Sequence, residues 1–323
     1  MKIGVVGCGA VGSYYGAKLW KIGQAVHFLL RSDFEAVSRD GLSIRSPGGS
    51  FHLRPACANN PKAIGVCDLV LIGLKTTANY EFPNLLPPLV GAETVLLTLQ
   101  NGLGNEEQLA KLFPPRQIMG GLAFVCLNRL APGVIHHIDH GQIVIGEFQG
   151  GPIGRTHHLA SLFRQAGVPC DVAPNLAQAH WEKLLWNIPF NGLGVAGTAG
   201  YEAVVAGDKR VSAGKCGLCL TTDLLLGEPR WEKLIRELQD EVRRAAAALG
   251  YQISEKLPEK LLSLTRTMGA YKASTLLDFE QGKPLEMESL FLEPLRQARQ
   301  AGVQMPRLEA MCEVLKAVDN KKI

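Results

Sequence analysis

Short apolar runs alternate with amphipathic stretches over roughly the first 150 residues of the chain. The apolar runs predict strands buried on both faces and lie at 2–7, 25–30, 68–74 and 94–99. The stretches 10–23 and 106–113 carry the periodicity of helices. Strands that alternate with helices form parallel sheets covered by helices, and we predict that architecture here.

Two further stretches read as β-structure. Residues 42–54 (LSIRSPGGSFHLR) predict a hairpin that closes on a Pro-Gly-Gly turn. Residues 134–148 (VIHHIDHGQIVIGEF) are rich in β-branched side chains and are expected to extend the sheet.

Helical periodicity dominates from about residue 175, where extended runs nearly vanish. The helical segments are 175–187, 230–250, 259–268 and 289–302. Two prolines interrupt 168–175, and a chain of 323 residues exceeds what one core usually supports. We therefore predict two domains, 1–172 and 173–323. The Gly- and Ala-rich stretch 192–217 is expected to be an irregular excursion between helices.

Composition limits the possible functions. Hydrophobic residues make up 46% of the chain, charged residues 20%, and the formal net charge is +4. So small a charge allows local cationic sites but predicts no general affinity for nucleic acid. No apolar run approaches the ~18 residues of a membrane span, and the first residues do not resemble a signal peptide. We expect a cytoplasmic protein without nucleic-acid or membrane partners, whose cysteines, including the pair Cys216 and Cys219, are reduced thiols rather than zinc or redox ligands.

A glycine pattern connects the first strand to the first helix. GCGAVG fits G-x-G-x-x-G, with Gly7 for a tight turn, Gly9 for close approach of a pyrophosphate and Gly12 for helix–strand packing. Backbone N–H groups and the helix dipole would stabilise the negative charge. The predicted cofactor-binding residues of this loop are Gly7, Cys8, Gly9, Ala10, Val11 and Gly12. The fold class is α/β, with a Rossmann-type doubly wound N-terminal domain and an all-α C-terminal domain.

The end of the second strand indicates which dinucleotide is bound. An NAD site places an acid there for the ribose hydroxyls, whereas this chain has Arg31. A guanidinium is permanently charged and forms paired bonds to phosphate oxygens, which suits the 2′-phosphate of NADP(H). Asp33 is the alternative, either as a displaced NAD-type acid or as a helix cap. We predict NADP(H).

Two polar loops follow later strands. Lys75 follows the strand at 68–74, and Asn101 follows the strand at 94–99. Ligands of open α/β sheets bind beyond the carboxyl ends of the strands. Lys75 could therefore meet phosphate or substrate, and Asn101 the nicotinamide ribose or substrate. The alternatives are a solvated lysine and an Asn-Gly turn.

A polar stripe marks an otherwise apolar helical segment. Lys183, Asn187 and Asn191 are spaced four apart and would share one face of the helix 175–187 and its continuation. A lysine whose pKa is tuned by desolvation can protonate the alkoxide formed when a ketone is reduced. The alternative is a lysine at a helix edge with two solvated amides. Pro189 is expected to end or bend the helix between the two amides.

These motifs together resemble the ketopantoate reductase (2-dehydropantoate 2-reductase) family. The matching segments occur in family order over nearly the whole chain: GCGAVG at 7–12, Arg31, LK at 74–75, QNGLG at 100–104, KLLWNIPFN at 183–191 and LEMES at 285–289. The resemblance implies an NADPH-dependent reduction of a small 2-keto acid, 2-dehydropantoate, to (R)-pantoate on the route to coenzyme A. It also implies that the site lies in a cleft between the two domains.

The resemblance further implies residue roles. Lys183 would be the general acid, Glu286 would accept a hydrogen bond from the substrate hydroxyl, and Ser274 would lie near the substrate carboxylate. The residues implied to bind or orient substrate and its ketone are Asn101, Asn187 and Asn191. The chain departs from the family pattern at Ala78, where Gln is usual, at Phe291 and Leu292, where Asn-Gly is usual, and in the length of 192–217.

Three alternatives remain open at this point. The chain could be a related two-domain NADP-dependent enzyme for another 2-keto or 3-hydroxy acid, or an NADP(H) sensor without turnover. HHIDH (136–140) could hold a metal, but on a strand His136 and His140 would face away from His137 and Asp139. We expect no metal there and surface or dimer-contact histidines, with a homodimer as the assembly.

Overall fold

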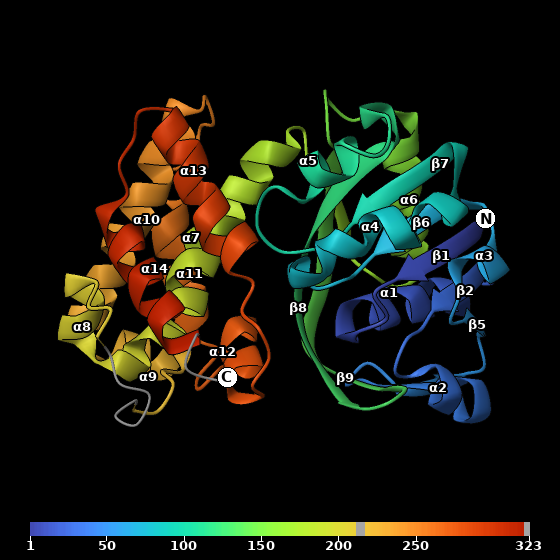
Figure 1. Cartoon of the computed structure of the whole chain (residues 1–323), viewed down its shortest axis with the longest axis horizontal. Helices are drawn as coiled ribbons and strands as arrows, with labels where there is room; N and C mark the ends of the chain where they lie inside the picture. The colour runs from blue at the N-terminus through green and yellow to red at the C-terminus, as the bar shows by residue number, and fades with distance from the viewer. Residues whose placement is uncertain (211–216, 320–323) are drawn as a thin grey trace. The chain divides into compact units, whose positions relative to one another are not determined.

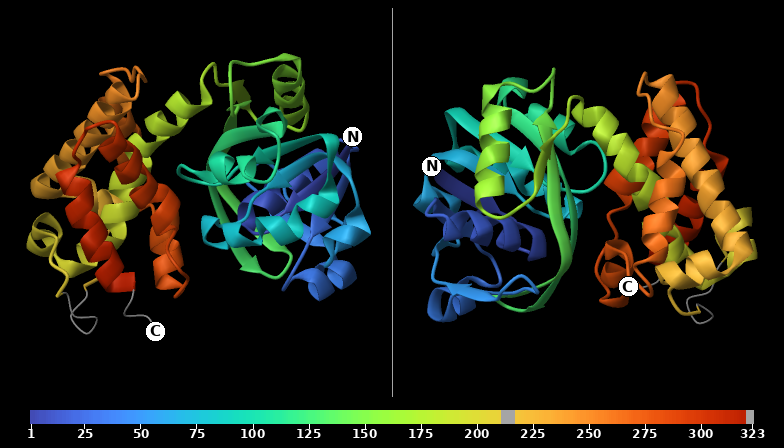
Figure 2. Two further views of the ribbon diagram at one scale, coloured as in Figure 1. Left: turned by 45° about the horizontal axis from the view of Figure 1, so that its top comes forward. Right: turned by 180° about the vertical axis from the view of Figure 1, so that it is seen from behind.

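The computed structural model describes residues 1–210 and 217–319. Contacts within the chain divide it into two compact units, residues 1–176 and 177–323. This division lies a few residues after the boundary expected from the sequence. Figure 2 shows the first unit as a sheet between helices and the second as helices only.

Parallel strands form the centre of the sheet in the first unit. β1 (Lys2–Val6) lies between β2 (Ala25–Leu29) and β6 (Cys67–Ile72), and β7 (Val90–Thr98) follows beside β6. β5 (Ala56–Ala58) pairs with the outer side of β2. The four strands predicted from apolar runs are confirmed.

An antiparallel extension continues the sheet beyond β7. β8 (Ile118–Ala131) runs parallel to β7 and forms a long hairpin with β9 (Val134–Glu147), the curved ribbon labelled in Figure 1. The remaining strands are β3 (Leu42–Arg45), β4 (Phe51–Leu53) and β10 (Cys170–Val172). The sheet order is β4-β3-β9-β8-β7-β6-β1-β2-β5, with β10 beside β9. The predicted hairpin at 42–54 and the strand at 134–148 are confirmed, whereas β8 was not predicted.

Helices cover both faces of the sheet. In β6, Leu69 and Leu71 join one apolar cluster and Val70 and Ile72 join the other, so the strand is buried on both faces. The helices are α1 (Ala10–Lys21), α2 (Phe34–Asp40), α3 (Pro61–Ile64), α4 (Phe82–Leu85), α5 (Asn105–Ala110) and α6 (Gly154–Gln165), with 3₁₀ turns η1 (Thr76–Glu81), η2 (Pro87–Leu89) and η3 (Pro115–Gln117). The Rossmann-type doubly wound class is therefore confirmed, although the sheet is mixed.

The second unit is helical throughout its described residues. Its elements are α7 (Leu176–Ala196), η4 (Gly197–Ala199), α8 (Tyr201–Ala206), α9 (Thr222–Gly227), α10 (Pro229–Ala248), α11 (Leu257–Arg266), α12 (Ser274–Glu280), the π-helical turn η6 (Glu288–Leu292), α13 (Glu293–Gln300) and α14 (Pro306–Asp319). Across the described ranges, none of these helices, nor any in the first unit, has the length and apolarity needed to span a membrane.

The described part of the Gly- and Ala-rich stretch, residues 192–210 and 217, is mostly helical, contrary to the sequence-based expectation. α7 continues to Ala196, and η4 and α8 follow. The glycines allow close packing inside helices: a Cβ on Gly192 would lie 2.3 Å from the side chain of Met311, and one on Gly197 would lie 2.4 Å from Leu220. Residues 211–216, with Cys216 of the C-x-x-C pair, lie outside the described residues.

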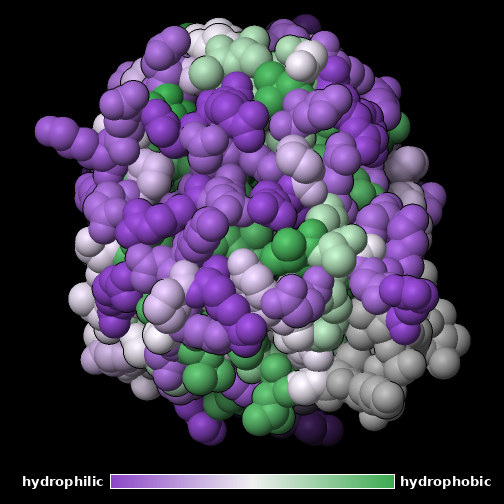
Figure 3. All heavy atoms as spheres, turned by 90° about the vertical axis from the view of Figure 1, so that its left-hand side faces the viewer, coloured by the Kyte–Doolittle hydropathy of each residue, from purple (hydrophilic) through white to green (hydrophobic). Residues whose placement is uncertain are grey.

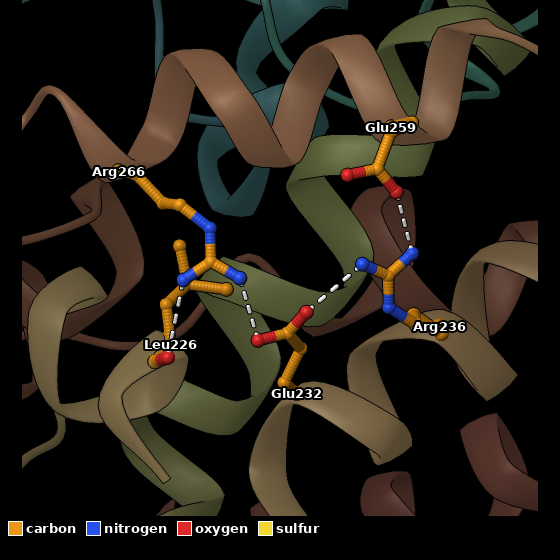
Figure 4. Close-up of polar contacts among 5 residues, drawn as sticks. All are labelled: Leu226, Glu232, Arg236, Glu259 and Arg266. Carbon is orange, nitrogen blue, oxygen red and sulfur yellow. Dashed lines mark hydrogen bonds and ion pairs between the residues drawn. The ribbon is translucent and has the colours of Figure 1, made fainter. Parts of the chain in front are cut away.

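Surface ion pairs between two helices, and a hydrogen bond to a third, join α9, α10 and α11 of the second unit (Figure 4). Glu232 of α10 accepts hydrogen bonds from Arg236, 2.9 Å away, and from Arg266 of α11, 2.6 Å away. Arg236 also reaches Glu259, and Arg266 donates to the carbonyl of Leu226 in α9. Exposed pairs of this kind contribute little singly. The face in Figure 3, which belongs to this unit, is mostly polar with scattered apolar side chains.

Candidate functional site

The glycine loop has the geometry that a pyrophosphate site needs. Gly7 has φ of +89°, and a Cβ there would lie 2.2 Å from the backbone nitrogen of Leu74. A Cβ on Gly12 would lie 2.3 Å from the carbonyl oxygen of Gly7. Gly9 is different, because a Cβ there would meet nothing within 4 Å. Gly9 is the N-cap of α1. Because glycine has no side chain, no side chain caps the helix N-terminus that begins with Ala10 and Val11.

Cys8 anchors the loop to the sheet. Its thiol donates to the carbonyl of Leu29 at 3.2 Å and to that of Val5 at 3.4 Å, which are residues of the neighbouring strands β2 and β1. Burial, and then the negative charge of Asp33, raise the pKa of the Cys8 thiol. Cys8 is therefore held as a neutral thiol, and only its backbone can serve a ligand.

Arg31 and Asp33 differ sharply at the end of β2. Arg31 is exposed. Asp33 is only 6% exposed, and its carboxylate accepts hydrogen bonds from Arg129 and, at 3.1 Å, from the backbone N–H of Gly133. Burial by itself would raise the pKa of the Asp33 carboxyl, but these hydrogen bonds and the charge of Arg129 lower it. Asp33 ties the β8–β9 hairpin to this loop. It occupies the N-cap position of α2, as the helix-cap interpretation expected, but its side chain makes no capping hydrogen bond.

A buried network of amides supports the loops that carry Lys75 and Asn101. Gln100 donates to Asn79 at 2.6 Å, and Asn79 donates to Asn105 at 3.0 Å. Asn105 in turn donates to the backbone carbonyl of Asn101 at 3.1 Å. This network was not predicted, because each amide alone is typical of an ordinary loop residue. Asn79, next to the departure at Ala78, is therefore a structural amide.

Four predicted binding segments follow parallel strands of this sheet. The glycine loop follows β1, Arg31 follows β2, Lys75 follows β6 and Asn101 follows β7. Parallel strands end at the same edge of a sheet, so all four segments lie at one edge. Lys75 is exposed and Asn101 is partly buried there.

Lys183 is a partly buried amine on α7. Burial lowers the pKa of Lys183 from 10.5 to about 8, and the negative charge of Glu286 acts in the opposite direction. Glu286 is 4% exposed and directly precedes the helical turn that leads into η6. The two groups that the resemblance paired in function therefore interact electrostatically within the second unit.

The two asparagines of the stripe are buried and differ in their partners. Asn191 accepts hydrogen bonds from the backbone N–H of Thr275 at 3.0 Å and from the hydroxyl of Ser274 at 3.2 Å. Its oxygen thus satisfies the first turn of α12. Its amide nitrogen lies 3.4 Å from the oxygen of Asn187. Ser274 and Asn191 therefore lie together, with Asn187 beside them.

Neighbouring helices hold α7 on both sides of the stripe. The indole N–H of Trp186 donates to Thr265 of α11 at 3.0 Å, and its ring stacks on Phe190 with centroids 5.1 Å apart. The side-chain amide of Gln239 in α10 donates to the carbonyl of Leu185 at 3.1 Å. Nothing in the local sequence around α7 indicates Thr265 or Gln239.

Pro189 lies inside α7, so the expectation that the helix ends there is wrong, and the expected bend stays a prediction. A proline cannot donate to the carbonyl four residues earlier, which is that of Leu185. Gln239 supplies a donor to this carbonyl, which explains how the helix continues.

The histidine segment does not form a metal site. Both ring nitrogens of His137 are engaged, one with Ser46 at 2.8 Å and the other with the carbonyl of His140 at 2.9 Å. His137 is 8% exposed and packs on Tyr14, so the expectation of a surface position is wrong for this residue. Within the described ranges, no group of three His, Cys, Asp or Glu residues could hold a metal ion.

Comparisons with known proteins agree over the whole chain. The family model described as ketopantoate reductase PanE/ApbA matches residues 3–150, and its C-terminal counterpart matches residues 216–319. A 2-dehydropantoate 2-reductase from Nostoc sp. is 37% identical over 99% of this chain and 96% of its own length. A solved structure of 2-dehydropantoate 2-reductase from Geobacter metallireducens is 43% identical with a TM-score of 0.89, and the match covers 98% of this chain and 99% of that one.

More distant structures share the fold alone. D-mandelate dehydrogenase in complex with NADH and anilino(oxo)acetate is 18% identical with a TM-score of 0.87, over 100% of this chain and 99% of that one. A dimeric ketopantoate reductase from Staphylococcus aureus is 19% identical with a TM-score of 0.77, over the full length of both chains. On the full-length identity to the Nostoc enzyme and the two matching family models, this chain is an oxidoreductase that belongs to the ketopantoate reductase family.

Proposed function

We propose that the chain catalyses the NADPH-dependent reduction of 2-dehydropantoate to (R)-pantoate, a step of pantothenate biosynthesis. One observation carries the proposal: Lys183 is an amine whose pKa is lowered to about 8, beside the charge of Glu286, in a chain of this family. An amine tuned close to neutral pH is suited to donate a proton.

The residues of the first unit fit a dinucleotide. Gly9 leaves space for a pyrophosphate at an uncapped helix N-terminus. Arg31 is exposed and would bind the 2′-phosphate, while Asp33 is already engaged by Arg129. Lys75 and Asn101 would complete the binding site at the same edge of the sheet. Bound NADPH would supply the hydride.

The residues of the second unit would supply the proton and orient the substrate. The ammonium of Lys183 would donate its proton to the ketone oxygen as that oxygen gains negative charge, leaving a neutral amine. Glu286 would accept a hydrogen bond from the substrate hydroxyl, and Ser274 would bind its carboxylate. Asn187 and Asn191 would position the substrate, Asn191 through its amide N–H because its oxygen already serves α12.

Oxidation of NADPH in the presence of 2-keto acids tests the proposal. We expect turnover with 2-dehydropantoate and much slower turnover with 2-keto acids that lack its hydroxyl, since the hydrogen bond from that hydroxyl to Glu286 would then be lost. Lys183→Ala should lower kcat by about 10²–10⁴ while NADPH still binds. Equal rates with every 2-keto acid would contradict the substrate assignment.

The remaining alternatives give different results in the same assay. A related enzyme would prefer another 2-keto or 3-hydroxy acid, and an NADP(H) sensor would show no turnover and no effect of Lys183→Ala. We also propose a homodimer, by analogy with the dimeric Staphylococcus aureus enzyme, and a mass measured by light scattering tests it. A cytoplasmic location stays a prediction of the sequence.

A further inference from the structure

The backbone of α7 contains a carbonyl that cannot accept the usual hydrogen bond from an N–H of its own helix four residues later. In a regular α-helix the Leu185 carbonyl would accept the N–H of residue 189. Residue 189 is proline, which has no N–H. Leu185 is itself fully buried, so a carbonyl without a donor would be costly there.

Gln239 of α10 supplies the missing donor. Its Nε2 lies 3.1 Å from the Leu185 oxygen, 54 residues away in the sequence. A carbonyl oxygen only accepts, so the NH₂ end of the amide must face it. Gln239 is 1% exposed, and its Oε1 is buried and accepts no hydrogen bond from the part of the chain that the structure describes.

This arrangement indicates what the glutamine is for. Burying an amide with an unpaired oxygen disfavours folding. An apolar side chain at position 239 would avoid this unfavourable contribution to the free energy of folding. The hydrogen bond to Leu185 is what an apolar residue could not provide. Leu185 lies in the turn between Lys183 and Asn187, the first two residues of the polar stripe.

We propose that Gln239 is a positioning residue, which fixes the turn of α7 that carries Lys183 and Asn187 by replacing the N–H that Pro189 lacks. The inference rests on the proposed function, because it assigns Lys183 the role of general acid. Gln239 acts through α7 and touches neither substrate nor cofactor in this scheme.

A double-mutant cycle on the full chain tests the proposal. Gln239→Met keeps the approximate shape and removes the donor. Since small displacements of a reacting group can lower rates by as much as 10²-fold, we expect kcat for 2-dehydropantoate to fall roughly 10- to 100-fold, with an unchanged KM for NADPH. Pro189→Ala restores a backbone N–H toward Leu185, so the double variant should recover kcat to within about threefold of Pro189→Ala alone.

The decisive result is this rescue, which a general loss of packing at 239 would not produce. A double variant as slow as Gln239→Met, or a Gln239→Met enzyme with normal kcat, would overturn the proposal. If Gln239→Met does not fold, the double variant must fold, and its failure to do so would equally overturn it. If wild-type protein does not reduce 2-dehydropantoate, the proposed function fails instead, and the cycle is then read from the midpoint of urea unfolding, where coupling between 189 and 239 must still appear.

Discussion

At the scale of single residues, the properties of Lys183 follow from its surroundings. Trp181, Leu184 and Leu185 are apolar neighbours on the same helix and are almost fully buried. Removing water from an ammonium favours the neutral amine, which lowers its pKa. Glu286 limits this effect, so the amine stays largely protonated at neutral pH and can still release its proton.

The pKa of Lys183 predicts how activity depends on pH. Only the protonated amine can donate to the ketone, so kcat/KM for reduction, which reports groups of the free enzyme, should be constant below pH 8 and fall about tenfold per pH unit above it. In the reverse direction the neutral amine is the base, and kcat/KM for oxidation should rise through the same pKa. Steady-state rates in both directions over a pH series measure this.

Glu286→Gln is the matched variant for this profile. It removes the negative charge that raises the pKa of Lys183, so the fall in kcat/KM for reduction should begin at lower pH than in the wild type. If the pH profile of Glu286→Gln keeps the wild-type midpoint, or if Lys183→Ala shows the wild-type profile, the group that titrates is not Lys183.

Arg31 gives a prediction about the cofactor. Arg31→Ala should weaken NADPH binding by ~10- to 100-fold, because a charge-assisted bond to the 2′-phosphate is lost, and should leave NADH binding nearly unchanged. Fluorescence titration with both nucleotides checks the difference. Equal weakening of NADPH and NADH would show that Arg31 does not recognise the 2′-phosphate.

At the scale of elements, two glycines of the same loop should behave in opposite ways. Gly9→Ala adds a methyl group to open space, so the variant should keep its melting temperature but bind NADPH at least ~10-fold more weakly, since the methyl group would meet the pyrophosphate. Gly12→Ala places a Cβ 2.3 Å from the Gly7 carbonyl. It should lower the melting temperature even without nucleotide. Thermal unfolding and NADPH titration of both variants separate the two effects. A Gly9→Ala protein with full NADPH affinity would show that the pyrophosphate does not bind at this loop.

The elements that the sequence predicted are those whose pattern is local. β1, β2, β6 and β7 each contain a run of mostly apolar and buried residues, which packs against both faces of the sheet. β8 lacks such a run, since Gly120 and Gly121 interrupt it and its last three residues are exposed. Its regularity comes from pairing with β9, which a local pattern does not show.

The polar residues of the candidate site also divide into those that a local pattern predicts and those that it does not. Gly7, Lys183 and Glu286 could be named because motif and spacing mark them. The partners that support them could not, because they are distant in sequence: Arg129 lies 96 residues from Asp33, and Gln239 lies 54 residues from Leu185. Local rules therefore predicted an end or a bend of α7 at Pro189, whereas a side chain from α10 allows the helix to continue.

At the scale of the whole molecule, each unit contains one part of the proposed chemistry. All the segments assigned to the cofactor lie within residues 1–176. Lys183, Glu286 and Ser274 lie within residues 177–323. Each unit is compact, and the apolar clusters under the glycine loop consist of side chains from the first unit. Substitutions in one unit should therefore leave the internal structure of the other intact.

This division predicts that nucleotide recognition and proton transfer can be separated by mutation. Arg31→Ala should raise the KM for NADPH and leave kcat at saturating nucleotide within about threefold of wild type. Lys183→Ala should lower kcat and leave the KM for NADPH within about threefold of wild type. In the double variant the two free-energy changes in kcat/KM should add to within about 0.5 kcal/mol, because the two side chains belong to separate compact units. Steady-state kinetics of the four proteins measures the coupling. A coupling of several times that size would mean that binding at Arg31 controls the placement of Lys183, and the two units would then have to be treated as one catalytic body.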